Sequence, residues 1–311
     1  MAPEASAPET PAGPPTAPGL STKGLSSALA AYVIWGLFPL YLKPLHDVAT
    51  LEVIAQRIGW SCAFILVWMS MRGQLGSLRT VLATPALMWR LAVSATLITV
   101  NWIAYVYAVA NGHVLEASLG YFINPLVNVL LGVIVLSERL NRAQWVSVGL
   151  AAVAVLYLSF VAGRPPWISL TVALSFGLYG YVRKVIAVEA LPGLAAETLL
   201  LAPLAIGYLL WLEAVGSGTM GHASGAIDAL LVGSGPMTAV PLFLFAYGAR
   251  LIPYSTVGLL QYIAPSLQLA CGLLVFGETL EPHRAIGFVV IWTALLIYAA
   301  DGIWRSRRAP A

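Results

Sequence analysis

The chain has 311 residues, of which 59% are hydrophobic and only 9% are charged. Soluble proteins carry about 25% charged residues, so this composition excludes a protein whose surface lies entirely in water. The net charge of +3 and the lack of a Lys/Arg-rich run with interleaved aromatic residues exclude nucleic acid as a partner.

Residues 1–24 form a Pro/Ala-rich segment that we expect to be disordered. The first 20 residues contain six prolines and no large hydrophobic run. No basic stretch precedes an apolar core here, so the segment is not typical of a secretory signal. Lys23 stands directly before the first apolar stretch, which we therefore expect to remain as an uncleaved anchor.

Apolar stretches long enough for membrane helices follow one another along the rest of the chain. A helix that crosses a bilayer needs about 20 mostly apolar residues, and ten stretches meet this requirement. Short links such as 71–80 and 277–284 hold Gly, Pro and charged residues. The sequence therefore predicts an all-α membrane protein with ten transmembrane helices, at about residues 25–45, 52–71, 87–110, 115–136, 143–161, 167–187, 194–213, 227–248, 254–276 and 284–303.

The distribution of Lys and Arg predicts the orientation of these helices. With the N-terminus in the cytoplasm, 12 of the 16 Lys and Arg residues fall on the cytoplasmic side and four on the other. Positive charge favours cytoplasmic loops, and an even number of helices returns the chain to its starting side. We expect a multi-pass protein of a bacterial plasma (inner) membrane with both termini cytoplasmic, ending in a basic tail at residues 305–311.

The two halves of the sequence resemble each other. A shift of 140 residues superposes the fourth predicted helix on the ninth, and a shift of 141 superposes the first on the sixth. Chance aligns Leu with Leu easily, whereas matched Pro, Gly, Glu and Lys indicate a duplication. Each half then holds five helices, an odd number, so the second half enters the membrane inverted. The predicted repeats are residues 25–163 and 164–304, and the matched pairs include Pro125 with Pro265, Gly36 with Gly177, Gly132 with Gly272, Glu138 with Glu278, and Lys43 with Lys184.

Three stretches carry a resemblance to a known family. They are YVIWGLFPLYLK (32–43), LGYFINPLVNVLLGVIVLSERLNRAQWVSVGLA (119–151) and TAVPLFLFAYGARLIPYSTVGLLQYIAPSLQL (238–269). They resemble the drug/metabolite transporter superfamily, and among its EamA-domain members the RarD-like, chloramphenicol-sensitivity permeases. The resemblance covers about residues 25–303. It implies two inverted EamA repeats, transport without ATP hydrolysis and export of a small amphipathic metabolite or drug, and it leaves the natural substrate open.

Polar and aromatic side chains at membrane depth are the candidate substrate-binding residues. Such groups are costly in hydrocarbon and usually face the interior of a helix bundle. Prolines after Asn124 and Ala264 predict interruptions at matched places in the two halves, which point to a transport site. The alternative is that these side chains only join helices through hydrogen bonds. The candidates are Trp35, Asn101, Tyr105, Tyr121, Asn124, Asn128, Tyr179, Gln261, Tyr262 and Gln268.

Four charged residues are candidates for ion coupling or for a substrate's charge: Lys43, Arg57, Lys184 and Glu197. A cation at the end of a helix, or a carboxylate at its start, is also explained by the helix dipole and by contact with the membrane surface. Arg57 lies about one turn inside its helix and is expected to need a partner, for which Glu52 is slightly off the right face.

The sequence thus favours a secondary transporter that works by alternating access. An enzyme acting on a lipid or isoprenoid is the alternative, and it would need clustered His, Asp or Glu. The motifs HExxH, GxSxG and GxxxxGK[ST] do not occur, so we expect no catalytic activity, no metal site and no cofactor. The expected partners are a small-molecule substrate and the lipid bilayer, and the oligomeric state stays open, a homodimer included.

Overall fold

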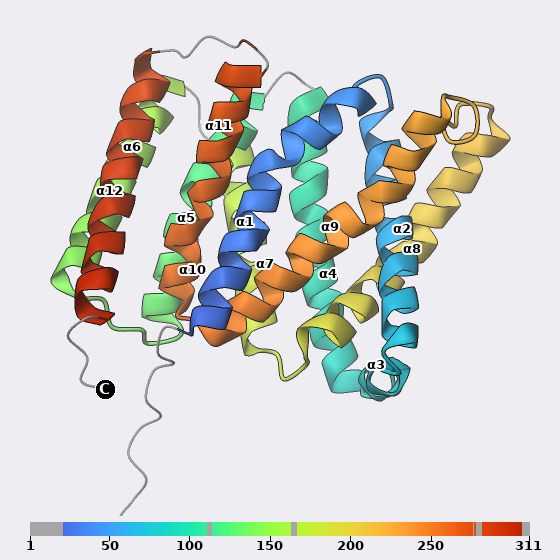
Figure 1. The fold of residues 1–311 in the computed structure, drawn as a ribbon, viewed down its shortest axis with the longest axis horizontal. Coiled ribbons are helices and arrows are strands. Elements are labelled where there is room, and N and C mark those ends of the chain that lie inside the picture. The colour runs from blue at the N-terminus through green and yellow to red at the C-terminus, as the bar shows by residue number, and fades with distance from the viewer. Residues whose placement is uncertain (1–20, 111–113, 163–166, 276, 278–281, 307–311) are drawn as a thin grey trace, which may run out of the picture.

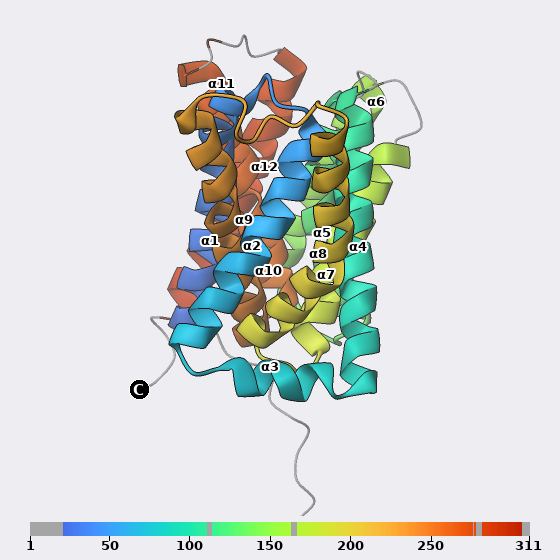
Figure 2. The same cartoon turned by 90° about the vertical axis from the view of Figure 1, so that its right-hand side faces the viewer.

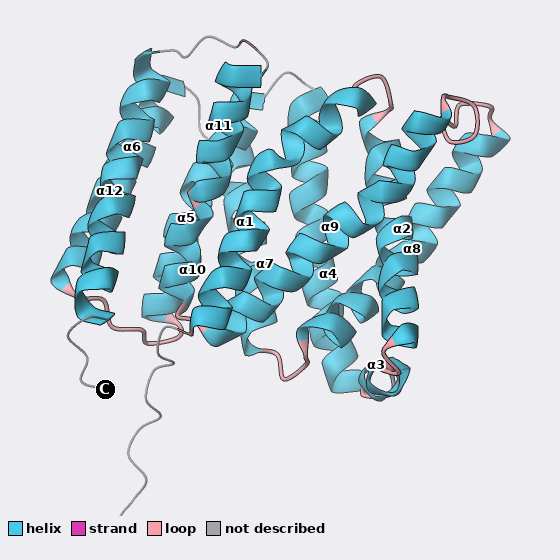
Figure 3. Ribbon diagram, in the orientation of Figure 1, coloured by secondary structure: helices cyan, strands magenta, loops and turns pink. Residues whose placement is uncertain are grey.

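A computed structural model describes residues 21–110, 114–162, 167–275, 277 and 282–306. These residues form helices joined by short loops, and no strand occurs among them (Figure 3). The helices are α1 (Thr22–Leu42), the 3-10 turn η1 (Lys43–Leu45), α2 (Thr50–Met71), α3 (Leu75–Leu82), α4 (Pro85–Ala110), α5 (Val114–Ile134), α6 (Arg142–Ala162), α7 (Trp167–Val185), α8 (Ala190–Ala214), α9 (Gly225–Leu251), α10 (Tyr254–Gln261), α11 (Ile263–Val275) and α12 (Pro282–Ser306).

Many of these helices are long and apolar enough to cross a bilayer. Among the described residues, seven spans of at least 18 residues meet that requirement, and the shorter helical segments Gly120–Ile134 and Ala285–Asp301 are also apolar. Large apolar side chains such as Phe160, Leu204 and Leu274 are largely exposed on the outside of the bundle. The protein is therefore an all-α, multi-pass membrane protein.

The helix α3 was not expected from the sequence. We expected residues 71–80 to be a plain link, but residues 75–82 are helical and run across one end of the bundle (Figure 2). Leu78 and Val81 are buried, whereas Arg79 on the same helix is exposed. This alternation suits a helix that lies flat at the membrane surface, and it is too short and polar to register as a membrane span.

The two predicted proline interruptions have different outcomes. Pro125 lies inside α5, which is continuous from Val114 to Ile134, so the predicted break there is wrong. The predicted stretch 254–276 does divide, into α10 and α11 at Tyr262. Pro265 falls in the first turn of α11, where a missing backbone N–H removes no helical hydrogen bond.

Helices of the first half of the chain pack on helices of the second half in matching pairs. Helix α1 packs on α9 and α11, and α7 packs on α4 and α5. The pairs α2 with α8 and α6 with α12 pack on each other at opposite edges of the bundle (Figure 1). In the same view α1 rises from the end where α12 finishes, and α7 runs in the opposite direction.

Two glycines, one in each half of the chain, make matching close contacts with a helix of the other half. A methyl group at Gly36 of α1 would lie 2.6 Å from Cβ of Leu267 on α11. A methyl group at Gly177 of α7 would lie 2.6 Å from Cγ1 of Val127 on α5. The two glycines are 141 residues apart and their neighbours 140 apart. Both glycines therefore allow the same kind of close helix approach.

Candidate functional site

Arg57 of α2 lies inside the bundle, among residues of several other helices. Its Nε donates a hydrogen bond to Oγ1 of Thr238 on α9 at 2.8 Å. Its guanidinium carbon stands 4.8 Å from the ring centre of Phe38 on α1 and 5.7 Å from that of Trp102 on α4. Such cation–π contacts stabilise a desolvated guanidinium by about 0.5–2 kcal/mol each. Glu52, the partner considered for Arg57 in the sequence, instead accepts hydrogen bonds from the backbone N–H and the hydroxyl of Thr219, each at 2.8 Å.

Three tyrosines complete the surroundings of Arg57. Tyr41, Tyr105 and Tyr121 lie within electrostatic range of its guanidinium. The rings of Tyr105 and Tyr121 meet edge to face with centroids 6.2 Å apart, and Tyr41 stacks on Phe38. We define the Arg57 site as Arg57, Phe38, Tyr41, Trp102, Tyr105, Tyr121 and Thr238. All except the buried Thr238 are partly exposed.

The buried asparagines join helices. Asn101 on α4 donates to the carbonyl of Val172 on α7 at 2.8 Å, and Asn124 on α5 donates to that of Ala173 at 2.6 Å. Asn128 donates to Oε1 of Gln261 on α10 at 2.8 Å. The hydrogen bonds of the structural alternative are therefore present, and contact of these amides with a substrate stays a prediction.

Two further candidates make similar contacts between the halves. The hydroxyl of Tyr262 donates to the carbonyl of Phe122, exactly the residue 140 positions earlier, at 3.1 Å. Gln268 on α11 donates to the carbonyl of Trp35 on α1 at 3.2 Å. The predicted shift of 140 residues pairs Tyr262 with Phe122, so this hydrogen bond joins two positions that we expect to be equivalent.

Trp35 and Tyr179 belong to a cluster of aromatic side chains, and Trp35 lies three residues before Phe38 of the Arg57 site on α1. Trp35 contacts Phe176 and Phe245 with centroids 5.8 and 5.7 Å apart, and Tyr179 stacks on Phe245 at 6.2 Å. Tyr179 is 1% exposed, whereas Trp35 is only partly buried. Of the two, Trp35 is the one that a bound molecule could reach in this conformation.

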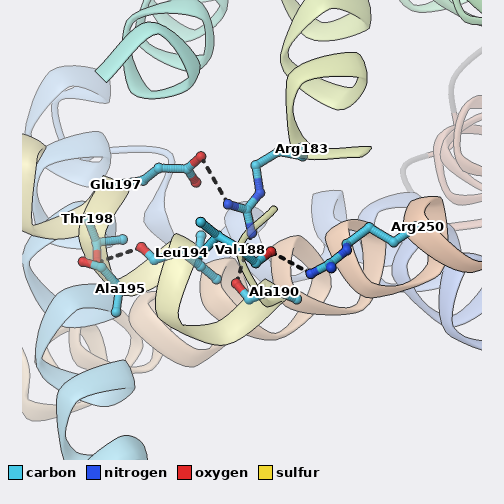
Figure 4. A network of polar contacts seen from close by, with 8 residues as sticks. All are labelled: Arg183, Val188, Ala190, Leu194, Ala195, Glu197, Thr198 and Arg250. Carbon is cyan, nitrogen blue, oxygen red and sulfur yellow. Dashed lines mark hydrogen bonds and ion pairs between the residues drawn. The ribbon is translucent and has the colours of Figure 1, made fainter. Parts of the chain in front are cut away.

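Glu197 lies in a buried ion pair rather than near the Arg57 site. Its Oε1 stands 3.5 Å from Nη1 of Arg183, and both side chains are at most 3% exposed (Figure 4). Nη2 of Arg183 also donates to the carbonyl of Ala190 at 2.9 Å. Gly193 leaves room for this guanidinium, since a methyl group there would collide with it. The pair joins the end of α7 to the first turns of α8.

The two repeat-equivalent lysines have different surroundings. Lys184 donates from Nζ to the carbonyls of Ala249 and Ile252, at 2.8 and 2.6 Å, and so caps the end of α9. Lys43 follows α1 directly and is exposed. Lys184 thus caps a helix other than its own, and a substrate role for either lysine stays a prediction.

Glu138 caps a helix of the other half of the chain. Its carboxylate accepts from the backbone N–H groups of Tyr254 and Ser255, at 2.5 and 2.9 Å, and from the Ser255 hydroxyl at 2.7 Å. The first N–H groups of a helix have no partner inside it and attract negative charge. In the sequence Glu138 follows the predicted helix 115–136, and nothing near it indicates that it caps a helix of the other half. Gly132 makes room for the carboxylate, since a methyl group there would lie 2.6 Å from it.

Replacing Glu138 by Ala is expected to lower the free energy of unfolding by about 1–2 kcal/mol, as the loss of a helix cap does. The measurement is chemical unfolding in detergent micelles followed by circular dichroism. Arg139→Ala, at an exposed neighbouring position, is the control and should leave the unfolding midpoint unchanged. Equal midpoints for both variants would contradict the capping role.

Part of the Arg57 site was not predicted from the sequence. We had singled out Arg57, Tyr105 and Tyr121, but not Phe38, Tyr41, Trp102 and Thr238. Spacing offered a weak signal, because residues three apart share a helix face, as Phe38 and Tyr41 do, and Trp102 and Tyr105. Nothing in the spacing indicated that these two faces meet around one arginine.

Comparison with known proteins gives a consistent result. A model of the EamA-like transporter family matches residues 22–160. RarD of Streptomyces exfoliatus is 45% identical, over 93% of this chain and 91% of its own length. An uncharacterized transporter of Pseudomonas aeruginosa is 46% identical, over 93% and 97%, and RarD of Escherichia coli 43%, over 92% and 97%.

One solved crystal structure has the same fold. It superposes with a TM-score of 0.69 over 90% of this chain and 98% of its own, at 19% sequence identity. At that identity the likeness concerns the fold alone, whereas the relatives above match nearly the whole sequence. The protein therefore belongs to the EamA-like transporter family of the drug/metabolite transporter superfamily, in its RarD-like group.

Proposed function

We propose that this protein is a secondary transporter that moves a small metabolite or drug-like molecule across the bacterial plasma membrane by alternating access. Two inverted five-helix repeats, residues 25–163 and 164–304, would rock against each other around a site between them. The family of the chain and the names of its relatives support transport. Export is the direction that the resemblance favours.

The correspondence between the helix contacts of the two halves is the observation on which this proposal depends. The contact of α1 with α9 corresponds to that of α7 with α4, and the contact of α1 with α11 to that of α7 with α5. An assembly of two equivalent, oppositely directed units has two related arrangements. Swapping the conformations of the units moves the opening of the site from one side of the membrane to the other.

The Arg57 site is the proposed substrate site. Its side chains come from α1, α2, α4 and α5 of the first half, and Thr238 comes from α9 of the second. A molecule bound there would touch both units, so its binding could respond to their relative position. The other sequence candidates near it, such as Trp35 and Gln268, would act at its border.

Polar contacts join helices at the end of the bundle where α1 starts, which we propose to be cytoplasmic. Glu138 caps α10, Lys184 caps α9, and Arg250 donates to the carbonyl of Val188 (Figure 4). These contacts join the ends of helices from different parts of the chain. Opening toward the cytoplasm would require some of them to separate.

An enzymatic function has no comparable support. The enzyme alternative called for clustered His, Asp or Glu, and within the described ranges no three His, Cys, Asp or Glu side chains gather as a metal-binding group would. Because the relatives are named as transporters, we propose a transporter without catalytic activity or cofactor, whose partners are its substrate and the bilayer. The proposal is compatible with a homodimer as the oligomeric state.

Counterflow in proteoliposomes tests the transport proposal. Vesicles loaded with an unlabelled amphiphile are expected to accumulate the labelled compound several-fold above protein-free vesicles, for at least one of an anionic, a neutral and a cationic panel. Accumulation equal to that of protein-free vesicles for all three panels would contradict transport.

The orientation has a separate test. Green fluorescent protein fused to either terminus should fluoresce in bacterial cells, and alkaline phosphatase fused to the same ends should stay inactive. The opposite result at one terminus alone would contradict an even number of spans.

A further inference from the structure

Arg57 carries a charge that the described part of the protein does not neutralise. Among the described residues no carboxylate forms an ion pair with it, and its hydrogen bond to Thr238 uses only Nε of its five N–H donors. Arg183 differs, because it is 1% exposed and paired with Glu197. Arg57 is partly exposed although aromatic side chains of other helices surround it. Its outer N–H groups are therefore placed to meet a bound molecule.

The walls around this charge are aromatic. Phe38 and Trp102 contribute aromatic rings, and Tyr105 and Tyr121 contribute rings together with hydroxyl groups, whereas the hydroxyl of Tyr41 already donates to the carbonyl of Leu230. Rings favour a flat or apolar body, and a guanidinium favours a planar carboxylate that accepts two parallel hydrogen bonds. A single cation at the centre suits a single negative charge better than a doubly charged phosphate.

We propose that the Arg57 site selects small monoanionic carboxylates with an aromatic or apolar body. This inference rests on the transport function proposed above and names the substrate class of the same site. The carboxylate would pair with the outer N–H groups of Arg57, and the body of the substrate would lie against the aromatic side chains of the Arg57 site. Thr238 would hold the guanidinium in place through Nε.

Binding of a matched acid and amide tests the proposal. The probes are 3-phenylpropionate and 3-phenylpropionamide, which share a body and differ in charge, and the measurement is calorimetric titration of the protein in lipid nanodiscs. The wild-type chain is expected to bind the acid at least 10-fold more tightly than the amide. Equal affinities, or no binding of the acid, would overturn the proposal.

Substitution of Arg57 assigns the selectivity to this residue. Arg57→Gln is expected to weaken binding of the acid about 10- to 100-fold, as the loss of a charge-assisted pair does, and to weaken binding of the amide much less, so that the preference for the acid is lost. Arg57→Lys should keep the preference for the acid at lower affinity, because ammonium cannot form the bidentate pair. The control Arg90→Gln removes an equal charge at an exposed position of α4 and should bind like the wild type. A preference for the acid that survives in Arg57→Gln would overturn the proposal.

Two further measurements separate a failure of this inference from a failure of the variant to fold and from a failure of the transport function. Should Arg57→Gln fail to fold, Thr238→Val removes the hydroxyl that holds Nε and is expected to reduce the preference for the acid about threefold; an unchanged preference would overturn the proposed geometry. Counterflow of neutral or cationic amphiphiles without that of 3-phenylpropionate would leave the transport function standing and remove only this inference.

Discussion

Replacing Glu197 by Gln is expected to lower the free energy of unfolding by about 3–5 kcal/mol, because it leaves the buried charge of Arg183 without its partner. The substitution nearly preserves shape, so the loss reports on charge rather than on packing. The carboxylate and guanidinium lie 3.5 Å apart and are at most 3% exposed, so water cannot replace the missing partner. Chemical unfolding in detergent, at one fixed pH, measures the effect.

Replacing both partners separates charge from structure. The double variant Arg183→Met with Glu197→Leu removes both charges and fills the space with apolar groups, and we expect it to recover most of the lost stability. Arg90→Gln, at an exposed position, should change the unfolding midpoint little. A single variant as stable as the wild type would mean that the pair contributes nothing to the fold.

The same variant tests the idea that Glu197 couples transport to protons. For a purely structural pair, the protein that remains folded should transport with the pH dependence of the wild type. For a coupling group, Glu197→Gln should transport at a rate that no longer follows the proton gradient. Flux measured at two gradients in vesicles with equal amounts of folded protein distinguishes the two.

Replacing Gly235 by Ala is expected to cost about 3 kcal/mol, since it forces two helices apart. The new methyl group on α9 would lie 2.5 Å from the carbonyl oxygen of Trp60 and even closer to its carbonyl carbon. Both are backbone atoms of α2, so no side chain can rotate away. The hydrogen bond from the Ser61 hydroxyl to the carbonyl of Gly235, at 3.0 Å, would be strained as well. Thermal unfolding in detergent measures the loss.

Gly207 provides the matched control for this substitution. It lies in the middle of α8, is exposed, and has no atom within 4 Å of a methyl group built on it. Gly207→Ala should leave stability unchanged or raise it by about 0.5–1 kcal/mol, because alanine restricts the unfolded chain and favours the helix. If both variants unfold at the same temperature, the close approach of α2 and α9 does not control stability.

The helices themselves could be predicted because membrane burial leaves a strong signal. Continuous apolar length identified the stretches, and the ends of the helices lie within a few residues of those expected. The structure differs from the prediction where polar or helix-breaking residues interrupt the apolar stretches. The helix α3 is short and half polar, so composition resembled a loop, and Pro125 stayed inside α5 because a surrounding bundle tolerates a missing hydrogen bond.

The site was harder to predict than the helices, because it depends on which faces meet. The amides of Asn101 and Asn124 are visible in the sequence as polar groups at depth, but only the packing determines that they bond to α7. Likewise Glu138 follows the predicted helix 115–136 in the sequence, whereas its carboxylate caps another helix 116 positions later. Contacts between the two halves leave no pattern in the local sequence, and only the similarity of the two halves indicated them.

The flat helix α3 makes the two halves unequal. It links α2 to α4 and packs against α8, whereas residues 215–224, which link α8 to α9, form turns and no helix. In a carrier made of two identical units, the inward-open and outward-open forms would have the same energy and each would be occupied half of the time. A brace on one side removes that balance, and a difference of only about 1.4 kcal/mol makes one form ten times more common than the other. Under the alternating-access mechanism proposed above, α3 would therefore favour one of the two forms, since nothing in residues 215–224 matches it.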